Sequence, residues 1–206
     1  MAELAPGRFR LGVGPSHQAV MEGMWGIPFE KPLTHLREYL YVLKQALQQG
    51  GQVEFAGRFF KVRANWGQPV NIQVMASGLR RRAFELIGEL ADGAISWVCP
   101  LPYIESVAMP ALSAGAVKAG RSRPEMVMHL GLCLHENGTE ARQAAMPLLR
   151  VYPQIPFYRQ MFLDAGFPEA AQGGMSEAMV DSILVHGDES AAADRLRRIA
   201  GAGDAA

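Results

Sequence analysis

The stretch "MASGLRRR", residues 75–82, joins small residues to basic ones where an apolar run meets a helical pattern. A helix N-terminus presents free N–H groups and a partial positive charge, so three arginines there are disfavoured unless an anion compensates them. We predict that the backbone of Ser77, Gly78 and Leu79 grips a phosphate, with Arg80 as counter-ion. The alternative is an ordinary glycine turn followed by solvated arginines.

A second candidate stretch is "GVGPSH", residues 12–17, which follows a strand-like run near the start of the chain. Gly12 and Gly14 let the backbone approach a flat ring closely, and Ser16 and His17 can hydrogen-bond to a ligand. His17 is also the candidate catalytic residue, because its unperturbed pKa lies near neutrality. The alternative is a strand-end turn in which His17 satisfies a neighbouring backbone group.

Two aromatic residues are candidate substrate contacts. Trp97 in "AISWVCP" ends a strand-like run and is placed to line a pocket, although a simple core aromatic would look identical. Tyr158 lies in "YPQIPFYRQMF", where prolines interrupt a helical pattern. This segment suits either a substrate-shaping insertion near the site or a subunit contact.

Strand-like and helix-like segments alternate along the whole chain. Strands are expected at residues 8–13, 70–78, 92–98 and 126–135, with a hairpin at 53–62 around Gly57. Helices are expected at residues 33–48, 79–91 and 102–120, and Gly50 and Gly51 are expected to end the first of them. Further helices are expected from residue 139 onward, with a break at Pro153 and Pro156, and after an Asp188 cap. The strands are continuous apolar runs, which is typical of a parallel sheet covered by helices. The fold class is therefore α/β, either a barrel or a doubly wound sheet, in a single domain over residues 1–206.

The composition favours a small-molecule protein. The 206 residues carry 20 basic and 20 acidic side chains, and this balance argues against nucleic acid or an anionic membrane as the main partner. Cys99 and Cys133 lie in apolar runs without metal-ligand spacing, so buried thiols of a reducing cytosol are expected and no metal site is. No apolar run approaches the roughly 18 residues of a membrane span, and no signal peptide is visible. We expect a cytoplasmic protein.

Four segments together resemble the luciferase-like monooxygenase superfamily. They are "GRFRLGVGPSHQAVMEGMWGIPFEKPLTHLREYL", "VEFAGRFFKV", "FELIGELADGAISWVCPLPYI" and "PAL..GA.KAGR", in that order. The resemblance implies a (β/α)8 barrel that uses FMN or coenzyme F420, with the cofactor across the carboxyl ends of the strands. It implies an oxidoreductase that passes a hydride between the reduced cofactor and a small organic substrate, or activates oxygen. Members of the superfamily are commonly dimers, so a homo-oligomer is expected.

The resemblance also numbers the strands. Residues 8–13, 70–75, 94–98 and 126–134 correspond to the fourth to seventh strands of the barrel, while the first three strand-helix units and the last strand have no counterpart. We therefore expect a partial TIM barrel, since a full one needs about 250 residues. The alternative function is a truncated, catalytically inactive flavin-binding or interaction protein, because open sheet edges invite pairing with another chain.

Overall fold

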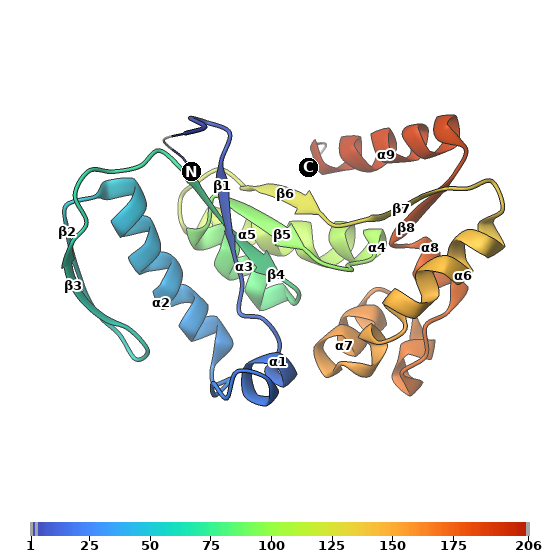
Figure 1. Cartoon of the computed structure of the whole chain (residues 1–206), viewed down its shortest axis with the longest axis horizontal. Helices are drawn as coiled ribbons and strands as arrows, with labels where there is room; N and C mark the ends of the chain where they lie inside the picture. Colours follow the sequence, from blue (N-terminus) through green and yellow to red (C-terminus); the bar gives the residue numbers. More distant parts are fainter. Residues whose placement is uncertain (1, 3, 205–206) are drawn as a thin grey trace. The chain divides into compact units, whose positions relative to one another are not determined.

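The computed structural model describes residue 2 and residues 4–204, and helices and strands alternate along this part of the chain (Figure 1). The main sheet has the strand order β1-β4-β5-β6. Its strands are β1 (Arg10–Val13), β4 (Gln73–Gly78), β5 (Gly93–Ser96) and β6 (Glu125–Met128). β1 and β4 are parallel, and the ladder runs from Arg10 opposite Gln73 to Val13 opposite Ala76. The predicted α/β class is confirmed.

Two compact units divide the chain. Unit 1 comprises Met1–Gly78, Arg82–Ile95 and Leu112–Glu125, and unit 2 comprises Leu79–Arg81, Ser96–Ala111 and Met126–Ala206. The single domain over residues 1–206 stays a prediction.

Unit 1 opens with β1 and two helices, α1 (Gln18–Gly23) and α2 (Pro32–Lys44). Pro32 starts α2 at a position where a missing N–H costs nothing. The helix continues as the π-helical turn η1 (Gln45–Gln49) and ends at Gly50, whose φ of 67° needs a residue without a Cβ. The predicted helix and its glycine stop are confirmed.

A hairpin follows, made of β2 (Gln52–Ala56) and β3 (Lys61–Asn65) in antiparallel register. Its turn is anchored by a carboxylate of α2. Glu38, only 8% exposed, accepts hydrogen bonds from the backbone amides of Arg58 (2.8 Å), Phe59 (2.8 Å) and Phe60 (3.1 Å). These contacts satisfy three turn amides with one side chain and fasten the hairpin to α2.

Asp92, just before β5, joins several elements of unit 1. Its carboxylate accepts from Lys44 Nζ (2.6 Å), Gln48 Nε2 (2.6 Å) and the amide of Val74 (2.9 Å), and Arg121 Nη2 lies 3.6 Å away. Partial burial alone would raise the pKa of Asp92, but Lys44 and these hydrogen bonds lower it below its usual value. The charged form of Asp92 therefore holds α2, η1 and β4 together.

Helices α3 (Arg81–Leu90) and α5 (Met109–Lys118) touch backbone to backbone within unit 1. A Cβ on Gly88 would overlap the carbonyl oxygen of Leu112, and a Cβ on Gly115 would overlap that of Glu85. Glycine at both positions permits the close approach.

Unit 2 contains the helical and extended elements of the second half of the chain. The helical elements are α4 (Leu101–Tyr103), η2 (Ile104–Ala108), α6 (Gly138–Leu149), η3 (Tyr152–Gln154), α7 (Pro156–Asp164), η4 (Pro168–Gln172), α8 (Glu177–Asp181) and α9 (Glu189–Asp204). The Asp188 carboxylate accepts from the amide of Ala191 at 2.7 Å, so the predicted cap of the last helix is confirmed. The predicted break in the preceding helical stretch is also confirmed, since η3 interrupts it between α6 and α7.

The single strand predicted over residues 126–135 is wrong. β6 ends at Met128, and β7 (Gly131–Leu134) pairs in parallel with β8 (Leu184–Gly187) in a separate two-stranded sheet. Between the strands, the amide of His129 donates to the carbonyl of Ser96 at 3.3 Å. One apolar run thus serves two sheets, and apolar periodicity does not reveal a change of pairing partner. β8 was not predicted.

No helix in the described residues is both long and apolar enough to cross a membrane.

Candidate functional site

The carboxyl ends of β1 and β4 bring together two of the predicted ligand-binding residues in unit 1. Because Val13 pairs with Ala76, Gly14, the residue after β1, lies beside Ser77, the penultimate residue of β4. A Cβ on Gly14 would overlap the Ser77 hydroxyl. The backbone of Gly14 therefore packs directly against a hydroxyl at the strand end where parallel α/β proteins bind their ligands.

The loop after Gly14 carries local strain. Ser16 has a φ of 60°, a left-handed conformation that is uncommon for residues other than glycine. His17 follows in extended conformation, and its carbonyl accepts from the amides of Val20 (3.0 Å) and Met21 (2.9 Å) at the start of α1. Burial lowers the pKa of the half-buried His17 imidazole, so the ring is mostly uncharged at neutral pH. An uncharged imidazole suits a hydrogen-bonding role, or a base, better than an acid.

Gly78 is the last residue of β4, and Leu79 follows it before α3. Gly78 is buried, and a Cβ there would press on Phe84 and Ile87. Packing of α3 against the strand end therefore explains this glycine without a ligand. Leu79 is half-buried and precedes the first residue of α3, Arg81, by two positions.

Arg80 already has a counter-ion within unit 2. Its Nη2 lies 3.0 Å from Oδ2 of Asp164, the last residue of α7, and both side chains are about one third exposed. The predicted solvated or phosphate-bound arginine is thus paired with a carboxylate. A guanidinium has five N–H donors, so this contact leaves donors for a second anion.

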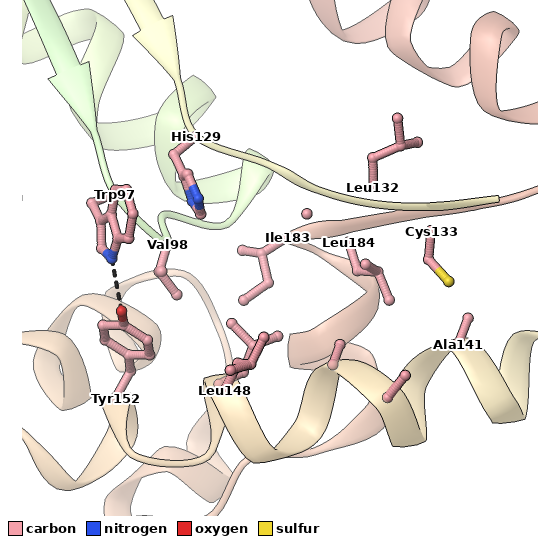
Figure 2. Close-up of a pocket in the computed structure, with 14 residues that line it drawn as sticks. Trp97, Val98, His129, Leu132, Cys133, Ala141, Leu148, Tyr152, Ile183 and Leu184 are labelled. Atoms are coloured by element: carbon pink, nitrogen blue, oxygen red, sulfur yellow. Dashed lines mark hydrogen bonds between the residues drawn. The ribbon is translucent and has the colours of Figure 1, made fainter.

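Trp97 follows β5 and belongs to an aromatic cluster of unit 2 (Figure 2). Its indole stacks on the His129 ring, with centroids 3.8 Å apart and an interplanar angle of 22°. Its Nε1–H donates to the Tyr152 hydroxyl at 2.7 Å. Trp97 is 47% exposed, so it is not the core aromatic of the alternative interpretation.

The cluster forms one end of a cavity of about 500 Å³, which Figure 2 shows between α6 on one side and β7 and β8 on the other. The cavity is lined by Trp97, Val98, His129, Gly131, Leu132, Cys133, Ala141, Ala144, Ala145, Leu148, Leu149, Tyr152, Ile183 and Leu184. Val98 has a φ of 52°, an outlier for a β-branched residue. It directs the chain away from β5 while Trp97 stays at the cavity wall.

Tyr158 does not line this cavity. It is 2% exposed, and its ring meets the ring of Tyr152 edge to face at 4.8 Å. Burial raises the pKa of the Tyr158 phenol, so it stays protonated. Tyr152 begins η3 and lies four residues before Pro156, the first residue of α7. It lines the cavity but was not selected from the sequence as a site residue. Its signal was its place in the same interrupted helical segment as Tyr158.

The two cysteines differ in their surroundings. Cys99 is buried, and desolvation raises the pKa of its thiol to about 12. Cys133 is half-buried at the cavity wall. Among the described residues, no three His, Cys, Asp or Glu side chains gather in a way that could hold a metal ion.

Unit 2 has a second cavity, of about 460 Å³. Met126, Met128 and Leu130 line it from β6 and the residues after it, and Leu196 and Ile199 line it from α9. Glu105 of η2 is the acidic residue of its lining.

Comparison with known proteins identifies relatives over most of the chain. The 5,10-methylenetetrahydromethanopterin reductase of Archaeoglobus fulgidus is 29% identical over 187 residues, which cover 88% of this chain and 52% of the relative. The chain thus spans about half the length of this curated relative.

Solved structures share the fold at low sequence identity. An F420-dependent secondary alcohol dehydrogenase, in complex with an F420-acetone adduct, has a TM-score of 0.78 at 18% identity, covering 98% of this chain and 63% of that one. The oxygenating constituent of 3,6-diketocamphane monooxygenase from Pseudomonas putida, in complex with FMN, has a TM-score of 0.64 at 16% identity, with the same coverage of 98% and 63%. These likenesses show the fold alone.

A family profile settles the membership. The profile described as luciferase-like monooxygenase matches residues 1–206. The predicted resemblance is therefore confirmed, and this chain belongs to the luciferase-like monooxygenase family.

Proposed function

We propose that this chain binds the ribityl phosphate portion of FMN or coenzyme F420 at the carboxyl ends of β1 and β4, as part of an oxidoreductase acting on a small organic substrate. The observation that carries the proposal is the direct packing of Gly14 against the Ser77 hydroxyl at the shared end of two parallel strands. The relatives support it, because one solved neighbour is described as F420-dependent and another is in complex with FMN.

The residues present fit a phosphate ester. Ser77 offers a hydroxyl next to a backbone that carries no side chain at Gly14, and residues 79–80 lead into the N-terminus of α3, where free amides favour anions. Arg80 retains guanidinium donors beyond its contact with Asp164. The Asp164 carboxylate would compete with the phosphate for Arg80, because both are anions.

The remaining predicted residues take roles around this grip. Gly14 and Ser16 would lie beside the flat ring, and His17 would hydrogen-bond to it or exchange a proton with the substrate. Trp97 would contact the substrate, and Tyr158 would support the substrate site through its contact with Tyr152. When bound, the reduced cofactor supplies either a hydride to a substrate carbon or the electrons that activate oxygen, while the protein positions the reactants and excludes water. A homo-oligomer and a cytoplasmic location stay predictions, the first to be checked by sedimentation.

The test is a titration of the purified chain with FMN, F420 and riboflavin, followed by cofactor fluorescence. Riboflavin lacks the phosphate, so FMN should bind more tightly than riboflavin. Arg80→Ala should weaken FMN binding about tenfold and leave riboflavin binding unchanged, since it removes a charge-assisted hydrogen bond. The matched control is Arg82→Ala, which removes an exposed arginine at the second residue of α3.

Two results would contradict the proposal. One is the absence of saturable binding of FMN and F420 to the folded chain, as checked by circular dichroism. The other is an equal loss of FMN affinity in Arg80→Ala and Arg82→Ala, which would show general charge attraction in place of a phosphate grip.

A further inference from the structure

We propose that the cavity between α6, β7 and β8 binds an uncharged, largely apolar molecule whose carbonyl oxygen accepts a hydrogen bond from the Tyr152 hydroxyl. The inference rests on unit 2 alone and does not depend on the proposed cofactor site. The two can therefore fail separately.

The cavity wall selects against charge. The described residues that line it include no Asp, Glu, Lys or Arg, and alanine, leucine, isoleucine and valine make up most of the surface. A charged ligand would lose its hydration there without gaining a partner. His129 is the titratable ring at the aromatic end, and burial lowers the pKa of His129, so the ring adds no charge at neutral pH.

One polar group at the aromatic end has a defined donor direction. An indole N–H can only donate, so the 2.7 Å contact between Trp97 and Tyr152 uses the phenol oxygen as acceptor. That bond does not consume the phenolic proton. Tyr152 can therefore donate to a ligand while it accepts from Trp97, and mutual polarisation strengthens both bonds.

The surrounding contacts hold this donor in place. The His129 ring stacks on the Trp97 indole, and the Tyr158 ring packs edge-on against Tyr152. Trp97 is fixed at its backbone by the turn at Val98, whose left-handed φ is held by a fully packed side chain at 2% exposure. A strained backbone conformation beside a cavity is a common accompaniment of ligand binding.

The size of the cavity suits a two-ring molecule or a branched chain. A volume of about 500 Å³ lies within the usual range of small-molecule sites, which bury most of a ligand against apolar walls and orient it with few polar groups. Tyr152 is the orienting group here, and Trp97 acts on the ligand through Tyr152 as a positioning residue.

The test uses three naphthalene probes that differ in one group: 2-propionylnaphthalene, which has a carbonyl; 2-propylnaphthalene, which has none; and 2-naphthoate, which is charged. Binding to the cofactor-free chain is measured by titration calorimetry. We expect the ketone to bind saturably and more tightly than the alkyl compound. 2-Naphthoate should bind at least tenfold more weakly than the ketone, because its carboxylate would lose its hydration without gaining a partner.

Tyr152→Phe removes only the hydroxyl and should weaken ketone binding about fivefold without changing 2-propylnaphthalene binding. Trp97→Phe should weaken ketone binding by a smaller factor, because the Tyr152 donor remains but loses its orientation. The control is Tyr41→Phe, which removes an exposed tyrosine hydroxyl that accepts from Gln45 in unit 1.

A second pair of variants tests the location. Ala144→Trp places a large side chain from the exposed side of α6 into the cavity and should abolish binding of both neutral probes. Gln143→Trp adds the same ring to the neighbouring exposed position, which does not line the cavity, and should leave binding unchanged. Circular dichroism confirms that each variant is folded.

The proposal is overturned if the folded chain does not bind the ketone, or if the charged probe binds as tightly as the ketone. Equal losses for ketone and alkyl probes in Tyr152→Phe would also overturn it, as would equal effects of Ala144→Trp and Gln143→Trp.

Discussion

The Arg80 guanidinium and the Asp164 carboxylate form an ion pair in unit 2, with 3.0 Å between Nη2 and Oδ2. The pair joins the residue just before α3 to the last residue of α7. Asp164 thus occupies part of the surface of Arg80 that a phosphate would use. If the proposed phosphate grip exists, the two anions compete for one cation.

Asp164→Asn should therefore tighten FMN binding about threefold, since a partly exposed ion pair contributes at most about 1 kcal/mol. Riboflavin affinity should stay the same. Fluorescence titration measures both, with the exposed Asp194→Asn as control. Unchanged or weaker FMN binding would argue that Arg80 serves Asp164 and not a phosphate.

Asp92→Asn should lower the free energy of unfolding by about 2 kcal/mol, because the carboxylate accepts from Lys44, Gln48 and the Val74 amide. Urea unfolding at pH 7 measures the loss. Asp194→Asn, which removes an exposed carboxylate beside Arg197, should change stability by less than about 0.5 kcal/mol.

The pH dependence of Asp92 has a defined sign. The pKa of Asp92 is lower in the folded chain than in the unfolded chain. Its contribution to the free energy of unfolding is therefore fully present above the unfolded-state pKa of about 3.9, and it is lost as the pH falls through the folded-state pKa. The wild type should lose stability between about pH 5 and pH 3 more steeply than Asp92→Asn. Parallel curves for the two proteins would show that Asp92 does not contribute through its charge.

Glu38→Gln should loosen the hairpin turn selectively. The substitution removes the charge that accepts from the amides of Arg58, Phe59 and Phe60. Hydrogen exchange at these three amides should accelerate, while exchange in β4 stays slow. Glu54→Gln, on the exposed face of β2, is the control and should leave the turn amides protected.

Gly115→Ala should destabilise unit 1 even though alanine favours a helix. The new Cβ would overlap the Glu85 carbonyl, and overpacking of this kind costs about 1–3 kcal/mol, more than the gain of about 1 kcal/mol in helix propensity. Thermal unfolding should show a lower Tm. Gly23→Ala at the end of α1 adds a Cβ to open space and should not lower it.

Local signals in the sequence predicted much of the fold. Gly50 after a run of leucines, Asp188 before an alanine-rich helix and Gly57 between two strand-like runs each mark a boundary through short-range chemistry. The meeting of Gly14 and Ser77 was also within reach, because the ends of parallel neighbouring strands lie at one edge of a sheet.

Features that depend on distant partners could not be predicted in the same way. β7 separates from β6 because β7 pairs with β8. The sequence of residues 126–135 contains no signal that predicts this pairing. The Asp164 carboxylate that meets Arg80 lies at the end of α7, far along the chain from Arg80. Tyr152 and Tyr158 share one proline-interrupted segment, and only tertiary packing places the first at the cavity and the second in the core.

The break between β6 and β7 connects the two cavities of unit 2 through one short stretch of chain. Met126 and Met128 line one cavity, and Leu132 and Cys133 line the other. The two residues of the break divide in the same way, because His129 lines the cavity of the aromatic cluster and Leu130 lines the second cavity. A ligand that shifts His129 in one cavity would therefore pull on the backbone that positions Leu130 in the other.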